Sequence, residues 1–514
     1  MSKPVGTCCV VLHTHLPWLA HHGTWPVGEE WLHQAWSSSY LRVVDVLDRL
    51  AAEGRRDLLT LGLTPVLAAQ LDDAYCLREF HTWLGFWQTR AESLAGRPEA
   101  YLRELGRYEF RLATEATATF ETRWRHGASP VLRGLADAGV VELLGGPATH
   151  PFTPLLDERV AEAQLAVGLE DGARRFGQPP AGIWAPECGY RPGLERLYAA
   201  AGVQRFLIDG PTLVAGVHHQ PHAHDNVATG GAWAVGDSNV VAFARDLDVT
   251  YRVWSPRRGY PGGHYYRDFH TFDHPSGIRP ARVTSTGTPP EHKAPYNPDA
   301  GHAAVDADAT DFVACVRRRL VDLAAARGRP SLVVVAYDTE LFGHWWHEGP
   351  AFLESVLRQL PDAGVEVTTL RGAAGGGAVA GRATLPDGSW GSGKDWHVWD
   401  GDQVRDLVDA GRDVQQRLLY VIDKALGGAQ SQRRPDLDAL THEAFLATSS
   451  DWAFMVTKDS AAGYARDRAG EHARRFHALA DRIESGRATD RLVEESRRID
   501  GVFGHLDARI LALP

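Results

Sequence analysis

The sequence predicts an α/β protein built on a barrel of parallel strands, with a helical domain at its C-terminal end. Short apolar runs rich in β-branched residues recur along the chain, and helical segments separate them. Runs that are apolar on both faces are typical of parallel strands covered by helices. Seven or eight such runs favour a barrel; they lie at residues 8–12, 58–63, 140–144, 181–185, 205–208, 240–244, 332–336 and 365–369.

The intervals between the runs are uneven and indicate insertions. Residues 74–124 are helical in pattern and long for one crossover, so they predict a helical insertion. Long loops rich in Gly and Pro inside a domain are usually functional, and 206–274 is expected to be an inserted loop region over the active site. The small-residue stretch 372–381 indicates a domain boundary. We therefore expect barrel segments at 1–205 and 275–375 and a helical domain at 376–514, with helices near 402–426, 435–447, 461–486 and 489–506.

Composition restricts the partners and the compartment. The chain has 514 residues, 44% of them hydrophobic, and a formal net charge of −11. This charge disfavours nucleic acid and anionic membranes, which bind basic surfaces. No signal peptide or membrane-spanning run is visible, and five cysteines in no zinc-binding pattern fit a reducing compartment. We expect a cytoplasmic monomer that binds neither nucleic acid nor membrane.

Polar side chains follow several predicted strands, where the active sites of parallel barrels lie. Glu187 and Asp338 each come directly after an apolar run. Glycoside cleavage with retention uses two such carboxylates, one as nucleophile and one as acid/base. The spacing alone leaves open which carboxylate has which role.

Three histidines, His13, His15 and His150, also follow strands and are candidates for hydrogen bonds to sugar hydroxyls or to the nucleophile. A His-x-His pair after the first strand also occurs in metal-dependent amidohydrolase-like barrels, and His150 and Asp338 would complete such a site. Those enzymes usually bridge two metals with a modified lysine. No lysine lies near a strand end here, since the chain has only Lys3, Lys293, Lys394, Lys424 and Lys458.

The motifs resemble glycoside hydrolase family 57, and all five stretches of the family pattern appear in order. They are HTHLP (13–17), GGPATHPFTPLL (145–156), WAPECGY (184–190), AYDTELFGHWWHEG (336–349) and SWGSGKDWHVW (389–399). Smaller matches are WPVGEEW (25–31), LGLTPVLAAQL (61–71), VWSPRRGYPG (253–262) and SSDWAF (449–454). The flanking stretches are most similar to the 1,4-α-glucan branching enzymes of the family.

The resemblance implies an incomplete (β/α)7 barrel with an inserted region and a C-terminal helical domain. It implies that Glu187 is the nucleophile and Asp338 the acid/base, that His13, His15 and His150 contact the substrate, and that neither a metal nor an organic cofactor is needed. The glucan-stacking tryptophans of the family fall on Trp31, Trp254, Trp390 and Trp399; Trp346 and Trp452 lie inside matching stretches and are further candidates. The substrate is an α-1,4-glucan, such as amylose, a glycogen-like polymer or a maltooligosaccharide, and the pathway is glycogen or α-glucan biosynthesis.

The second step of the reaction leaves alternatives open. Attack of a 6-hydroxyl on the glucosyl-enzyme gives branching, a 4-hydroxyl gives a 4-α-glucanotransferase, and water gives an α-amylase. Branching members carry a lid tyrosine after the nucleophile strand, but no tyrosine lies between Tyr198 and Tyr251, and Trp233 is expected near that place. A shorter lid favours hydrolysis. The His-rich stretch 218–224 is expected to be a solvated loop.

Overall fold

A ring of seven parallel strands forms the centre of the molecule, which the computed structural model describes at residues 3–25, 27–217, 227–255, 259–426 and 432–513. Each predicted strand of the ring is present. The strands are β1 (Gly6–Thr14), β2 (Leu59–Leu63), β3 (Val141–Leu144), β4 (Gly182–Ile183), β5 (Arg205–Asp209), β7 (Val241–Arg245) and β8 (Leu332–Asp338).

Two sheets meet to make the ring. One has the order β3-β2-β1-β8, and the other contains β7-β5-β4. The backbone N–H of Gly145 donates to Gly182 O at 3.1 Å and joins β3 to β4. The opposite seam, between β7 and β8, is bridged by Asp246 N–H to Val334 O at 2.8 Å. The ring is therefore the incomplete seven-stranded barrel that the resemblance implied.

The strands are apolar on both faces because each face is buried. Cys9 and Val11 belong to a cluster inside the barrel with side chains from β5, β7 and β8. Cys8, Val10 and Leu12 alternate with them and pack into the larger core under the surrounding helices. The eighth predicted strand, β9 (Val365–Val367), pairs with the first residues of β1, outside the ring order.

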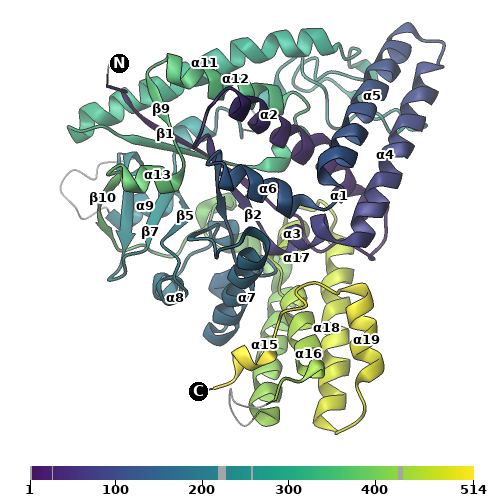
Figure 1. The fold of residues 1–514 in the computed structure, drawn as a ribbon, viewed down its shortest axis with the longest axis vertical. Helices are drawn as coiled ribbons and strands as arrows, with labels where there is room; N and C mark the ends of the chain where they lie inside the picture. The colour runs from purple at the N-terminus through teal and green to yellow at the C-terminus, as the bar shows by residue number, and fades with distance from the viewer. Residues whose placement is uncertain (1–2, 26, 218–226, 256–258, 427–431, 514) are drawn as a thin grey trace.

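Helices surround the barrel, and a long helical hairpin projects beside it (Figure 1). The hairpin is α4 (Ala74–Ala95) and α5 (Ala100–Thr119), in the place predicted for a helical insertion. The surrounding helices are α1 (Glu29–Ala35), α2 (Leu41–Ala52), α3 (Pro65–Asp72), α6 (Ala128–Asp137), α7 (Glu158–Phe176), α8 (Leu194–Ala200), α9 (Gly210–Val217), α10 (Leu247–Thr250), α11 (Pro298–Arg327), α12 (Gly349–Asp362) and α13 (Leu370–Gly375).

Two predicted domain boundaries are corrected by the structure. Residues 206–274 are not an inserted loop region, because they contain most of β5, all of β7, and β6 (Ala232–Val235), which runs antiparallel to β7. The strand β10 (Val379–Ala383) pairs with β6, so the predicted helical domain at 376–514 begins too early. Gly and Ala give a strand such as β10 little apolar signal in the sequence.

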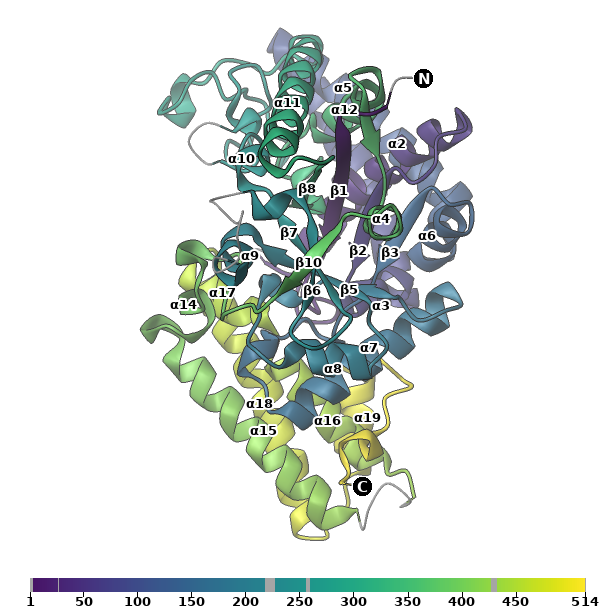
Figure 2. The same cartoon turned by 90° about the vertical axis from the view of Figure 1, so that its left-hand side faces the viewer.

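The C-terminal helices pack as a bundle against the end of the barrel (Figures 1 and 2). They are α14 (His397–Asp400), α15 (Arg405–Ala425), α16 (Pro435–Ala447), α17 (Ser450–Thr457), α18 (Ala462–Glu484) and α19 (Asp490–Ile499). α17 lies at the contact with the barrel, where Ser450 N–H donates to His150 O at 3.0 Å. Among the described residues, no helix combines the length and the apolar character that crossing a bilayer requires.

Candidate active site

The two predicted carboxylates lie where strands β4 and β8 end. Asp338 is the last residue of β8, and the register of the sheet places it beside His13 of β1. Glu187 lies in a short 3-10 turn after β4 and has a positive φ of 60°. A positive φ is unfavourable for a residue with a side chain and is tolerated mostly at functional positions. Both strand ends therefore carry a carboxylate into the same region.

The two carboxylates share one electrostatic environment. Burial, more than any other cause, raises the pKa of Glu187 to about 7. Burial and then the negative charge of Glu187 raise the pKa of Asp338 to about 7. The negative charge of Glu187 therefore disfavours the ionisation of Asp338, and the two groups titrate as a pair.

The hydrogen bonds favour the ionised form of Glu187. The indole N–H of Trp390 donates to Glu187 Oε2 at 2.8 Å, and Ser450 Oγ donates to Glu187 Oε1 at 2.9 Å. Both bonds lower the pKa of Glu187 against the effect of burial. No residue in the described part of the chain donates a side-chain hydrogen bond to the Asp338 carboxylate. These donors favour the ionised form of Glu187, and no comparable donor among the described residues favours the ionised form of Asp338.

A chain of hydrogen bonds leads from two histidines to Glu187. Ser450 has one hydrogen and donates it to Glu187, so it accepts from Nδ1–H of His150 at 2.9 Å. Nε2 of His150 then accepts from Nε2–H of His13 at 3.1 Å. Burial holds the pKa of both imidazoles well below the usual value, so both rings are neutral. His13 and His150 thus orient the serine that holds the carboxylate.

His15 is anchored by the helical domain. Its Nε2 lies 3.0 Å from both oxygens of Asp451, and its Nδ1 lies 2.9 Å from Thr64 Oγ1. Its ring stacks on that of His150 with centroids 3.7 Å apart. Although burial opposes it, the nearby His15 lowers the pKa of Asp451. The three predicted histidines are therefore gathered into one stack beside the carboxylate pair.

Comparison with known proteins identifies the group to which this chain belongs. Residues 9–383, more than half of the chain, match the model for Glycosyl hydrolase family 57.

The chain belongs to glycosyl hydrolase family 57.

Residues 412–511 match a second model, described as 1,4-alpha-glucan branching enzyme, C-terminal. The chain is 52% identical over 533 residues to a probable 1,4-alpha-glucan branching enzyme of Mycobacterium tuberculosis, with 99% of both chains covered. It is similar to the crystal structure of a branching enzyme from Pyrococcus horikoshii, with a TM-score of 0.91 and 30% identity over 99% of this chain and 97% of that one. It is also similar to an alpha-amylase of Thermotoga maritima, with a TM-score of 0.88 and 25% identity over 99% of both chains.

Membership of this family also bears on the metal-dependent alternative. Nitrogen and oxygen atoms of His15, His150 and Asp451 lie within 4.8 Å of one another, close enough to surround an ion. Each of these atoms already has a hydrogen-bond partner in the histidine stack, and metal binding would break the bond between His15 and Asp451. The arrangement fits hydrogen-bonding histidines of a family 57 site better than a metal centre.

Three of the six predicted tryptophans have ring surface that a glucan can reach. Trp31 and Trp390 are half-buried, and Trp254 is 37% exposed, with its ring centroid 5.8 Å from that of Trp345. Arg245 lies over the ring of Trp390, with its guanidinium carbon 5.2 Å from the centroid. Trp390 is also the residue that donates to Glu187, so this carboxylate and one aromatic surface are directly connected.

The other three tryptophans are buried, and the structure contradicts direct stacking on sugar for them. Trp346 has no exposed surface and packs on Phe352, and Trp399 stacks on Phe152 with ring centroids 4.6 Å apart. Trp452 is buried too, and its indole N–H donates to Leu446 O at 2.8 Å. Their rings are core residues, buried by the side chains that pack around them.

Trp233 does not stand in for the missing lid tyrosine. It lies on β6, packs against Gly381 of β10, and donates its indole N–H to Ala228 O at 3.0 Å. It is a structural residue of the small sheet. The His-rich stretch 218–224 lies outside the described residues.

Several residues of the site were not identified from the sequence. Ser450 and Asp451 lie in the quoted stretch SSDWAF, but only its tryptophan was selected. Asp209, fully buried at the end of β5, pairs with Arg245 at 2.9 Å and with Lys394 at 2.8 Å. Lys394 also donates to Trp390 O at 3.1 Å, so this cluster fixes the loop that carries Trp390. The position of Asp209 directly after an apolar strand was the available signal.

Proposed function

We propose that this chain is a 1,4-α-glucan branching enzyme, which cleaves an α-1,4 bond with retention and transfers the released chain to a 6-hydroxyl. One observation supports this most. The C-terminal region that matches the branching-enzyme model contacts the barrel through α17 and through Ser449 just before it. Within this region, Ser450 donates a hydrogen bond to Glu187. The full-length relative with 52% identity has the same activity in its name.

In the first step, Asp338 gives its proton to the glycosidic oxygen while Glu187 attacks the anomeric carbon. The hydrogen bonds from Trp390 and Ser450 favour ionised Glu187, and burial together with the charge of Glu187 favours protonated Asp338. Attack on an α-linked sugar yields a β-glucosyl-enzyme. The leaving chain end departs with the proton from Asp338.

In the second step, Asp338 removes a proton from the incoming hydroxyl, which displaces Glu187 and restores the α configuration. A 6-hydroxyl on a neighbouring glucan gives the branch. The exposed or half-buried rings of Trp31, Trp254 and Trp390 would hold glucan chains by stacking on the apolar faces of the sugar. His13, His15 and His150 would order the site around the anomeric centre.

Hydrolysis is the second candidate, because the similar Thermotoga maritima structure is that of an alpha-amylase. The absence of a tyrosine between Tyr198 and Tyr251 favours access of water. Tyr251 is the nearest tyrosine after this interval. Its ring is 40% exposed and lies 5.7 Å from Nζ of Lys394, which contacts Trp390.

Proton NMR of amylose after long incubation, with a reducing-end assay, tests the proposal. Branching predicts growing α-1,6 anomeric signals with few new reducing ends. New reducing ends without α-1,6 signals would assign the chain to the amylases instead. Glu187→Gln should abolish either product, because the amide is no nucleophile; a variant with full activity would refute the mechanism.

The physiological setting is also part of the proposal. We infer that the enzyme acts as a cytoplasmic monomer on storage α-glucan in glycogen biosynthesis. The cysteines support a reducing compartment, since all five are free and four are buried. Gel filtration and fractionation of cells test the state and the compartment.

A further inference from the structure

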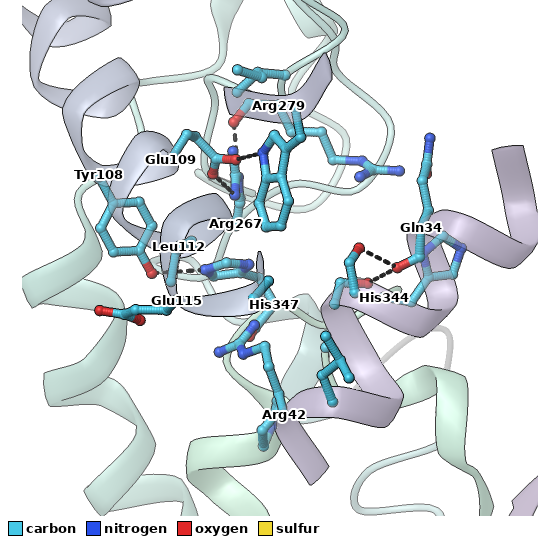
Figure 3. A pocket seen from close by; sticks show the side chains of 18 of the residues that line it. Gln34, Arg42, Tyr108, Glu109, Leu112, Glu115, Arg267, Arg279, His344 and His347 are labelled. Atoms are coloured by element: carbon cyan, nitrogen blue, oxygen red, sulfur yellow. Dashed lines mark hydrogen bonds and ion pairs between the residues drawn. The ribbon is translucent and has the colours of Figure 1, made fainter. Parts of the chain in front are cut away.

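A pocket that neither Glu187 nor Asp338 lines lies beside the helical hairpin. It has a volume of about 550 Å³ and is bounded by α1, α2, α4, α5, the loop at residues 267–279 and the segment that joins β8 to α12 (Figure 3). No member of the hydrogen-bonded chain at Glu187 lines it. Its size is within the range of sites that hold small ligands, about 300–1,000 Å³.

The charges of this pocket balance. Six arginines and six carboxylates line it. Arg267 pairs with Glu109 at 2.6 Å, and Glu109 also accepts the indole N–H of Trp87 at 2.8 Å. Asp268 pairs with Lys293 at 2.6 Å, and Arg49 pairs with Glu354 at 2.5 Å. Balanced charge gives little attraction for an ionic ligand and suits a neutral polar one.

The lining combines aromatic rings with many donors and acceptors. Trp83, Trp87, Tyr108, Phe269 and Trp345 contribute rings. Burial lowers the pKa of His344 to about 3, so it is neutral, and its Nδ1 has no hydrogen-bond partner in the described part of the chain. Rings together with planar polar groups match the apolar faces and equatorial hydroxyls of a glucose chain.

The pocket adjoins the segment that follows the acid/base strand. His344 N–H donates to Glu340 O at 3.2 Å, and Glu340 lies two positions after Asp338. Trp345 lines the pocket and also contacts Trp254, which is exposed. Trp345 therefore connects the lining of the pocket with the exposed ring of Trp254.

We propose that this pocket is a second glucan-binding site, distinct from the catalytic cleft, which holds a run of α-1,4-linked glucose units. This inference rests on the proposed function, because it takes the substrate to be an α-glucan. A second site raises the local concentration of polymer at the cleft without contacting the reacting bond. Long glucans therefore bind more tightly, whereas chains too short to span both sites gain no affinity.

The proposal is tested with substitutions that fill the pocket with a larger side chain and remove no polar contact. Ala116 lies on α5 and lines the pocket, whereas Ala118 lies on the same helix, is exposed and does not line it. Ala116→Trp should weaken glycogen binding about tenfold, as loss of the second contact in a bivalent complex does. It should raise the KM for amylose and leave kcat on maltotetraose unchanged. Ala118→Trp should behave as the parent. Leu112→Trp is a second occluding variant, and circular dichroism checks the fold of each.

Binding is measured in a Glu187→Gln background by affinity electrophoresis in glycogen gels, so the readout does not depend on turnover. If both occluding variants bind glycogen as tightly as the parent, the proposal of a second binding site is refuted, and a positive branching assay is unaffected by that result. If the parent forms no branches but Ala116→Trp binds glycogen more weakly than the parent, only the proposed branching function is refuted. Thermal melting with added ligands distinguishes a glucan site from an anion site. If inorganic phosphate raises the melting temperature of the parent and maltoheptaose does not, and if Ala116→Trp loses this effect, the pocket is an anion site and the glucan proposal is refuted.

Discussion

At the scale of single residues, opposing effects set the charge of Glu187, the proposed nucleophile. Burial raises the pKa of Glu187, while donors from Trp390 and Ser450 lower it. Asp338 experiences burial and the charge of Glu187, both of which raise its pKa. The difference in hydrogen bonding, more than any difference in burial, separates the roles of the two carboxylates.

Ser450→Ala tests this assignment. Loss of the donor should raise the pKa of Glu187, so less of it is ionised at neutral pH. The acidic limb of the pH profile of kcat/KM should move to higher pH by about 1 unit, since a hydrogen bond to a charged group contributes about 1.5–3 kcal/mol. Ser460→Ala, an exposed serine after α17, is the control. An unshifted acidic limb in Ser450→Ala would show that the serine does not tune the nucleophile.

At the scale of elements, the close approach of a loop to a helix positions His150. The loop after β3 packs on α7, where Ala148 N–H donates to Gln164 O at 2.9 Å. A Cβ at Gly168 of α7 would lie 2.0 Å from Gly146 O. Only a glycine allows the helix this near to the backbone that carries His150.

Gly168→Ala should therefore destabilise the protein and disturb the site together. Overpacking of a rigid contact costs about 1–3 kcal/mol, and displacement of His150 should lower kcat. Gly134→Ala is a matched control, because it lies inside α6 with no atom near its added Cβ and should stabilise by about 0.5–1 kcal/mol. Thermal melting and initial rates measure both. Equal melting temperatures for the two variants would contradict the contact.

At the scale of the whole molecule, buried ionic groups join the barrel to the helical bundle. His22, in the loop after β1, contacts Asp500 through Nε2 at 2.6 Å, and Arg475 of α18 pairs with the same carboxylate. Arg468 of α18 donates to Trp18 O at 2.7 Å. These bonds fix the bundle, and hence Ser450 and Asp451, against the barrel.

Asp500→Asn should destabilise the protein by about 3–5 kcal/mol, because it removes the charge of a buried carboxylate that accepts from His22 and pairs with Arg475. Against the effect of burial, the hydrogen bond from His22 holds the pKa of Asp500 well below its usual range. A depressed carboxyl pKa contributes stability above the unfolded pKa, near 4, that is lost as the pH falls. The variant should therefore lose most stability at neutral pH and less in acid. Asp409→Asn, which is exposed on α15, should change neither value; equal melting curves for both variants would exclude the buried link.

The sequence by itself determined the strands of the barrel, the helical hairpin and the carboxylate pair. Strands buried on both faces are continuous apolar runs, and residues after such strands must lie at one edge of the barrel. Glu187, Asp338, His13, His15 and His150 were therefore predictable as neighbours. The same logic applied to Asp209, which was overlooked.

Only the tertiary structure decided which rings are exposed and which residues from distant segments complete the site. Trp346, Trp399 and Trp452 resemble Trp254 and Trp390 in sequence, but tertiary packing buries the first three. Ser450 reaches Glu187 across 263 positions, and its serine-rich stretch has no local periodicity that reveals this contact. Burial and long-range hydrogen bonds depend on how domains pack, because each is a relation between segments that the local sequence does not encode.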